Sequence, residues 1–207
     1  MSDRTSPDST KVGGWLFRHR TSLPIPVALA LLGLRVGEAS PSMTLVYGGA
    51  ILTVAGEALR VWAVHHIGAI SRTRSGRLGP LIDSGPFGLA RNPLYVGNIL
   101  LWTGFALTAR LVWMAPVILV LLGAEYHAIV RWEEQLLAST HGDAYRDYCA
   151  RVPRWRPTLR HSTAASTSFV APVEAKAFSW RETLFSERGT LIAIAAGYVL
   201  LWIKARF

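Results

Sequence analysis

Residues 91–134 decide the fold, and their sequence is RNPLYVGNILLWTGFALTARLVWMAPVILVLLGAEYHAIVRWEE. Two apolar runs, Leu94–Leu107 and Leu111–Val130, are separated in it by only 3 residues. A run of about 20 apolar residues crosses a bilayer, and a short join makes two such helices antiparallel neighbours. The sequence therefore predicts a membrane hairpin that returns its polar ends, Arg91-Asn92-Pro93 and Glu133-Glu134, to the same membrane face.

The composition is typical of a small integral membrane protein with water-exposed loops. Of 207 residues, 51% are hydrophobic and 8 are tryptophan, and the mean hydropathy is +0.29. The formal net charge of +9 comes mostly from arginines that flank apolar runs, and no nucleic-acid motif accompanies them. Positive-inside topology explains this pattern and places the loops at 65–90 and 131–160, with Arg72, Arg74 and Arg77, in the cytoplasm. The single cysteine, Cys149, excludes an intramolecular disulfide, and we expect it to be inert.

Further apolar runs extend the predicted bundle. Leu23–Val36 is short for a span and also fits a signal peptide. Because a second apolar run, Met43–Val64, follows almost at once, we interpret Leu23–Val36 as a first membrane helix. Val173–Leu184 has helical apolar spacing, with Lys176, Arg181 and Glu187 expected on the surface, and predicts an amphipathic helix on the membrane. Thr190–Ile203 either spans the bilayer or is tilted or re-entrant.

We thus expect an all-α integral membrane protein of about five transmembrane helices, with a cofactor pocket at the cytoplasmic face and an interfacial amphipathic helix. The expected organisation is a disordered N-terminus and interfacial anchor (1–22), an N-terminal hairpin (23–65), a catalytic core with its hairpin (66–160) and a linker with C-terminal helices (161–207).

Small and charged residues within Met43–Val64 have specific roles in this prediction. Gly49 and Gly56 share one helical face and would allow a neighbouring helix to approach closely. Glu57 and Arg60 are spaced to pair, either as a structural ion pair or as part of a site. His65-His66 lacks an obvious third metal ligand, so we interpret it as interfacial and expect no metal site.

The polar clusters at the ends of the hairpin suit a charged ligand. Asn92 before Pro93 predicts an N-cap and a helix start, whose positive end, reinforced by Arg91, attracts an anion such as a carboxylate. Glu133 and Glu134 point about 100° apart, so one can contact a cationic ligand while the other pairs with Arg131. Tyr145 and Tyr148 would clamp a planar ring or seal the loop against the membrane.

Three motifs in this order resemble the isoprenylcysteine carboxyl methyltransferase and phospholipid methyltransferase superfamily. They are Gly85-Pro-Phe-Gly-Leu-Ala-Arg-Asn-Pro-Leu-Tyr-Val-Gly97, Glu133-Glu134-Gln-Leu-Leu, and His141-Gly-Asp-Ala-Tyr-Arg-Asp-Tyr148 followed by Val152-Pro-Arg154. Arg60 also resembles an arginine of that family, and the resemblance covers about residues 48–157. Asn92 stands where the family commonly has histidine; asparagine can keep the cap and a hydrogen bond but cannot accept a proton.

The resemblance implies an all-helical membrane enzyme that binds S-adenosylmethionine at the cytoplasmic face and methylates a lipophilic acceptor, namely a prenylcysteine carboxylate, a phospholipid amine or a small thiol. It implies no nucleic acid and no obligate protein partner. Together with the residue arguments above, it leads us to expect catalytic Arg91 and Glu134; cofactor-binding Asn92, Pro93, Tyr95, Gly97, Glu133, Glu134 and Tyr145; and substrate-binding Arg60 and Tyr148.

Two other functions remain open from the sequence. A membrane reductase of the sterol type shares a similar helical core and would bind NADPH, whose extra phosphate requires more cations. A non-catalytic protein would use its basic loops to bind anionic lipid, with strong salt dependence and no affinity for a cofactor.

Overall fold

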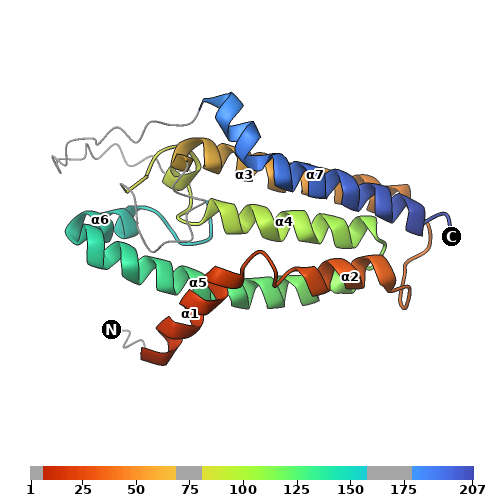
Figure 1. The fold of residues 1–207 in the computed structure, drawn as a ribbon, viewed down its shortest axis with the longest axis horizontal. Helices are drawn as coiled ribbons and strands as arrows, with labels where there is room; N and C mark the ends of the chain where they lie inside the picture. Colours follow the sequence, from red (N-terminus) through yellow and green to blue (C-terminus); the bar gives the residue numbers. More distant parts are fainter. Residues whose placement is uncertain (1–6, 69–80, 158–178) are drawn as a thin grey trace.

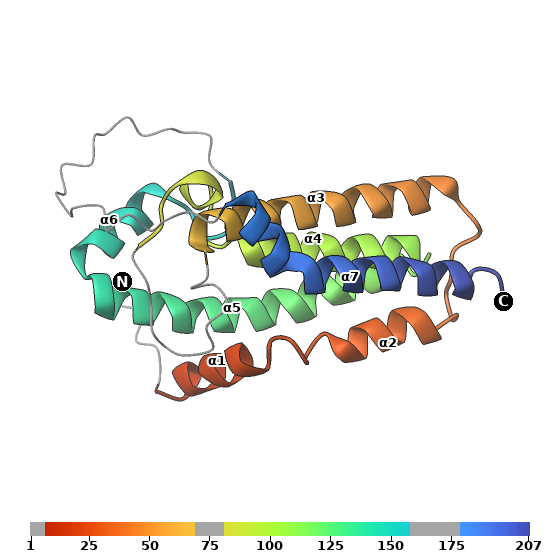
Figure 2. The same cartoon turned by 45° about the horizontal axis from the view of Figure 1, so that its top comes forward.

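The chain forms a helical bundle in the computed structural model, which describes residues 7–68, 81–157 and 179–207. Its elements are α1 (Pro7–His19), α2 (Ile25–Gly33), α3 (Met43–Ile67), η2 (Gly85–Gly88), α4 (Pro93–Thr108), α5 (Met114–His141), α6 (Asp143–Arg151) and α7 (Trp180–Lys204). In Figure 1, α4 lies between α5 and the pair α3 and α7. Figure 2 shows α1 and α2 following one another along α5. No strand occurs in the described ranges, in agreement with the predicted all-α class.

Three of the described helices are long and apolar enough to cross a membrane: α3, α5 and α7. They support the predicted integral membrane class. Helix α2 has 9 residues and α4 has 16, fewer than the roughly 20 that a straight span needs. The predicted total of about five spans is therefore not reached by length and hydropathy alone. The run Leu23–Val36 becomes so short a helix because Pro24 stands at its N-cap and Leu34 is already extended.

Helices α3 and α4 are in contact through their backbones along four glycines. A Cβ atom on Gly49 would lie 2.5 Å from the carbonyl oxygen of Gly104, and one on Gly56 would lie 2.5 Å from that of Gly97. We call Gly49, Gly56, Gly97 and Gly104 the glycine contact face. It confirms the predicted close approach at Gly49 and Gly56 and fixes α4 against α3.

The C-terminal helix differs from its prediction. Trp180–Leu184, expected in a separate amphipathic helix, forms the first turns of α7, because Ser179 and Glu182 make a capping box that starts the helix there. Residues 173–178 of that expected helix lie outside the described residues. The apolar run at 190–203 is thereby extended to a 25-residue helix, which is long enough to cross a bilayer.

A charged cluster lies at the end of the bundle where α7 terminates. Glu38 pairs with Lys204 at 2.9 Å and with Arg110 at 2.8 Å, and Arg35 donates to the Lys204 carbonyl oxygen at 2.9 Å. Burial opposes ionisation of Glu38, but the hydrogen bond and charge of Lys204, together with Arg110 and Arg35, outweigh it and lower the pKa of Glu38. Three cationic groups at this end thus share the single carboxylate of Glu38.

Candidate functional site

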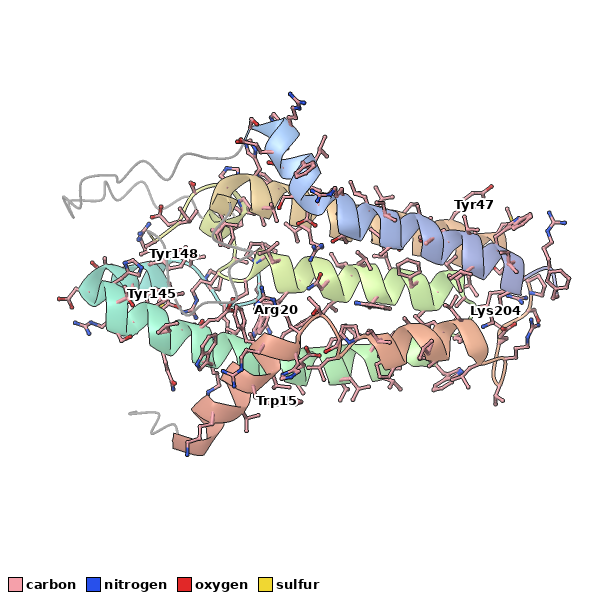
Figure 3. All side chains as sticks on the ribbon, viewed as in Figure 1. Trp15, Arg20, Tyr47, Tyr145, Tyr148 and Lys204 are labelled. Atoms are coloured by element: carbon pink, nitrogen blue, oxygen red, sulfur yellow. The ribbon has the colours of Figure 1, made fainter. Side chains whose placement is uncertain are left out.

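The α4–α5 hairpin brings the two polar clusters together, as the sequence predicts. The Tyr95 hydroxyl donates to Glu133 Oε2 at 3.0 Å, and Arg91 Nη1 lies 3.2 Å from Glu134 Oε1. Figure 3 shows Tyr145 and Tyr148 near this end of the bundle and Lys204 at the opposite end. Residues about 40 positions apart in the chain thus share one polar site.

Helix α4 starts at the predicted residues, but the predicted side-chain cap is not formed. Asn92 occupies the N-cap, and Pro93 is the first helical residue, yet the Asn92 side chain makes no cap hydrogen bond. Its Nδ2 donates instead to the Arg154 carbonyl oxygen at 3.2 Å, and the Arg91 backbone N–H donates to the Pro153 carbonyl oxygen at 2.9 Å. The predicted Asn92 cap is wrong because the segment after α6 provides competing acceptors. The first turn of α4 therefore has no side-chain cap.

Glu134 is held by two arginines. Arg154 forms a bidentate contact with it, at 3.1 Å from Nε and 2.6 Å from Nη2, and Arg91 approaches the same carboxylate. The hydrogen bond to Glu134 raises the pKa of Arg154, with burial opposing it. Arg91 also donates to Cys149 Sγ at 2.5 Å. Arg91 thus carries a compensated charge, although its Nε is buried without a hydrogen-bond partner among the described residues.

The two tyrosines of α6 pack closely. Helix α6 begins after Gly142, whose φ of 54° lies in the left-handed region that favours glycine. The Tyr145 and Tyr148 ring centroids are 6.0 Å apart at 52°, and the Tyr148 hydroxyl donates to the Phe87 carbonyl oxygen at 2.8 Å. Burial raises the pKa of both phenols. The tilted rings favour the predicted loop seal over a parallel clamp.

A second polar layer lies deeper in the bundle and is centred on Arg60. Its guanidinium contacts Glu57 at 3.0 Å and Glu187 of α7 at 2.7 Å. It also donates to Thr190 Oγ1 at 3.3 Å and to Asn98 Oδ1. Asn98 follows Tyr95 by three residues, about 4.5 Å along the axis of α4. The Arg60 layer therefore lies about one helical turn below the Tyr95–Glu133 contact.

One cavity of about 840 Å³ joins these layers. Its volume falls in the range of about 300–1,000 Å³ that is typical of ligand sites. The polar half is lined by Arg91, Asn92, Pro93, Tyr95, Glu133, Glu134, Tyr145 and Tyr148. The Arg60 layer follows, and the far half is apolar, lined by Leu31, Leu101, Phe105, Gly197 and Leu201. The cavity thus has a charged half that continues into an apolar half.

Of the sequence-predicted site residues, Gly97 is placed differently from the others. A Cβ atom there would lie 2.7 Å from Arg60 Cγ and 2.7 Å from the Gly56 carbonyl oxygen. Because Gly97 has no Cβ atom, the Arg60 side chain has room to cross α4. Gly97 therefore supports the Arg60 layer through packing.

Sequence reasoning missed several residues of the cavity: Arg20, Asn98, Tyr126 and Glu187. Glu187 was expected on the surface and is 1% exposed. That expectation is wrong because Arg60, 127 positions earlier, compensates its charge inside the bundle. The one available signal was a lone carboxylate three residues before an apolar run, since such a charge needs a buried partner.

Of the pair His65 and His66, His65 lies against α7 and His66 lies beside Gly85 of η2. The ring of His65 stacks on Trp180 with centroids 4.0 Å apart, and its Nδ1 lies 3.3 Å from Thr183 Oγ1. In the described parts of the chain, no three His, Cys, Asp or Glu side chains gather to hold a metal ion.

Comparison with known proteins identifies a family whose matched range includes much of this site. A sequence model of the phospholipid methyltransferase family matches residues 44–144, a range that includes Arg60, Arg91, Tyr95, Glu133 and Glu134. It ends before α7.

Two relatives extend the match. The cobalt-zinc-cadmium resistance protein CzcN of Cupriavidus metallidurans is 30% identical over 169 residues, covering 77% of this chain and 73% of the relative. The nickel-cobalt-cadmium resistance protein NccN of Alcaligenes xylosoxydans xylosoxydans is 27% identical over 163 residues, covering 75% and 73%. No solved structure matches the chain significantly. By its helical bundle, its matched core and these relatives, the chain belongs to the phospholipid methyltransferase family.

Proposed function

We propose that the protein transfers a methyl group from S-adenosylmethionine to a lipophilic acceptor at the cytoplasmic face of a membrane. The observation that carries this proposal is that one continuous cavity has a charged half and an apolar half. A zwitterionic donor suits the first half, and an alkyl chain suits the second. The two ligands would meet at the Arg60 layer, where the halves join.

The residues of the polar half fit the charges of this cofactor. The α4 start has no side-chain cap, and the buried Arg91 Nε lacks a hydrogen-bond partner among the described residues, so both suit a carboxylate. Glu133, oriented by the Tyr95 hydroxyl, suits an ammonium group. When bound, S-adenosylmethionine would supply an electrophilic methyl group on a sulfonium. The chain's own part is to orient the two ligands and to exclude water.

The pairing of the arginines bears on the reductase alternative. Arg60, Arg91 and Arg154 each contact a carboxylate, so none of these three can bind the extra phosphate of NADPH without giving up that contact. The polar half therefore favours S-adenosylmethionine over NADPH.

Charge distribution supports the cytoplasmic orientation. Arginines are frequent around the site end, including Arg131, Arg146, Arg151 and Arg156. At the other end, the described cations are Arg35, Arg110, Lys204 and Arg206, fewer than the arginines around the site. Positive-inside topology places the more basic end in the cytoplasm. Arg72, Arg74 and Arg77, on which the sequence-based orientation also drew, lie outside the described residues.

The names of the two relatives associate those proteins with resistance to divalent metals. For this chain, the proposal rests on the cavity and not on a metal centre. If this chain shares that physiological setting, we propose that methylation of a membrane component is its contribution.

The decisive experiment measures binding of isotope-labelled S-adenosylmethionine to the purified protein, with NADPH as competitor. We expect saturable binding that NADPH does not displace, and weaker binding in Glu133→Gln. Glu125→Gln is the matched control, because Glu125 lies on the same helix without lining the cavity. Wild-type protein that binds no S-adenosylmethionine would refute the proposal; displacement by NADPH would favour a reductase.

A further inference from the structure

The Arg60 layer has an unusual charge balance for a site next to an apolar chamber. One guanidinium contacts two carboxylates, Glu57 and Glu187, so the three groups together carry a net negative charge when ionised. Asn98 and Thr190 contribute further acceptors to the same guanidinium. Arg60 is 14% exposed in its side chain, whereas Glu187 is 1% exposed. The wall of the cavity here is an arginine whose donors are directed at other residues of the protein.

Such an arginine is a poor site for a ligand carboxylate. A guanidinium binds a carboxylate best through two parallel N–H donors. In Arg60, the Nε group is engaged by Glu57 and the Nη2 group by Glu187 and Thr190. A carboxylate ligand would have to displace Glu187 into a buried place without its partner, which is costly.

The Arg60 layer favours a ligand amine for the same reasons that it disfavours a ligand carboxylate. An ammonium group is attracted by the net negative charge of the layer, and a neutral amine can donate hydrogen bonds to its oxygen atoms. The apolar half beyond, with Leu101, Phe105 and Leu201, would accommodate the hydrocarbon part of the molecule.

We propose that Glu187 is a positioning residue that sets acceptor specificity: by holding Arg60, it makes the site select a lipophilic amine and reject a lipophilic carboxylate. This inference rests on the proposed function, because it concerns the acceptor half of the same cavity. Glu187 belongs to α7, outside the family-matched range 44–144. Acceptor preference is therefore assigned to a helix that the matched core does not include.

The test uses two probes with the same chain, dodecylamine and dodecanoate, in radiolabelled form. The full-length protein is placed in phosphatidylcholine nanodiscs, and empty nanodiscs of the same composition give the partition background. Retention of each probe is measured with S-adenosylhomocysteine present, so that the readout needs no methyl transfer. We expect the wild type to retain the amine in preference to the carboxylate by about tenfold, the factor that about 1.4 kcal/mol of differential interaction produces.

The Glu187→Gln variant distinguishes a specificity role from a merely structural one. Releasing Arg60 should move the preference toward dodecanoate by about tenfold, whereas general damage would lower retention of both probes. Glu57→Gln, which frees the Nε side of Arg60, should move the ratio in the same direction and serves where Glu187→Gln fails to fold. Glu38→Gln, in the charged cluster at the opposite end, should leave the ratio unchanged.

Two results would overturn the inference: wild-type protein that retains dodecanoate as well as dodecylamine, or folded Glu187→Gln and Glu57→Gln variants with the wild-type ratio. Binding of labelled S-adenosylmethionine is measured on the same samples. Absence of this binding in the wild type would refute the proposed function, whereas the probe ratio measured on protein that binds the cofactor concerns only the role of Glu187.

Discussion

At the scale of single residues, the site consists of side chains that orient one another. Tyr95 orients Glu133, Arg154 and Arg91 hold Glu134, and Glu187 holds Arg60. The sequence identified Tyr95, Glu133 and Glu134 because their motifs flank the hairpin. It did not identify Arg154 and Glu187 as partners, because ion pairs between distant positions depend on how helices pack and leave no local pattern.

The Tyr95–Glu133 contact leads to a prediction for cofactor binding. Tyr95→Phe removes the hydroxyl that donates to Glu133 and leaves the ring in place. Loss of one hydrogen bond to a carboxylate costs about 1.5–3 kcal/mol where the bond is fully formed, so we expect the affinity for S-adenosylmethionine to fall by about tenfold or more. Isothermal titration calorimetry measures this change. An affinity equal to wild type would show that Glu133 needs no such support.

At the scale of helices, the glycine contact face determines how the matched core is assembled. The sequence predicted close approach from the spacing of Gly49 and Gly56, and the structure supplies the partners Gly97 and Gly104. The length of α7 was not predictable from hydropathy, because its first turns are polar and owe their helical state to the Ser179–Glu182 capping box. Packing glycines leave a periodic signal, whereas a cap can extend a helix beyond its apolar run.

A substitution pair on α3 tests this contact. In Gly56→Leu, a Cβ atom would lie 2.5 Å from the Gly97 carbonyl oxygen, and backbone cannot move aside cheaply. We expect a loss of about 1–3 kcal/mol in the free energy of unfolding. The control is Gly48→Ala on the same helix, where a Cβ meets nothing within 4 Å and better helix propensity gives at most a small gain. Unfolding in mixed micelles compares the two; equal stabilities would argue against a tight contact.

The charged cluster at the C-terminal end of α7 predicts a pH dependence of stability. Because Lys204, Arg110 and Arg35 lower the pKa of Glu38 against the effect of burial, its ionised form stabilises the folded state. The contribution is complete above the ordinary glutamate pKa of about 4.3 and is lost as the pH falls through the lowered value. We expect wild type to unfold at higher temperature than Glu38→Gln at pH 7.

The difference in unfolding temperature should narrow as the pH falls below about 4. Thermal unfolding in detergent from pH 7 to pH 3 measures both variants. A difference that stays constant over this range would mean that the Glu38 charge does not contribute.

At the scale of the whole molecule, the site and the C-terminal end of α7 lie at opposite ends of the bundle (Figure 3). The sequence predicted the class, the hairpin and the site end from hydropathy and arginine placement. The number of membrane crossings was harder to predict, because α4 begins only at the Asn92-Pro93 motif and α2 is confined between Pro24 and the extended Leu34, so neither helix reaches the usual span length.

This arrangement predicts that the two ends face different sides of the membrane. Alkaline phosphatase fused after Phe207 should be active when the protein is expressed in a bacterial inner membrane, because that enzyme folds only outside the cytoplasm. A cysteine introduced at exposed Arg146, near the site, should react with a membrane-impermeant maleimide only after the cells are opened; Cys149→Ser provides the background. Labelling of intact cells would reverse the proposed orientation.

The contrast between the two faces of α3 has a further consequence. On one face, α4 is joined through glycine backbones; on the other, α7 is joined largely through side chains, by the pairs Thr53–Tyr198, Arg60–Glu187 and His65–Thr183. Side-chain contacts can be exchanged for contacts to a ligand, whereas a backbone contact cannot. Helices α3 and α4 thus form the fixed part of the cavity wall, and α7 forms the part whose contacts a ligand can replace. Loading and release of a bulky molecule would leave the contact between α3 and α4 undisturbed.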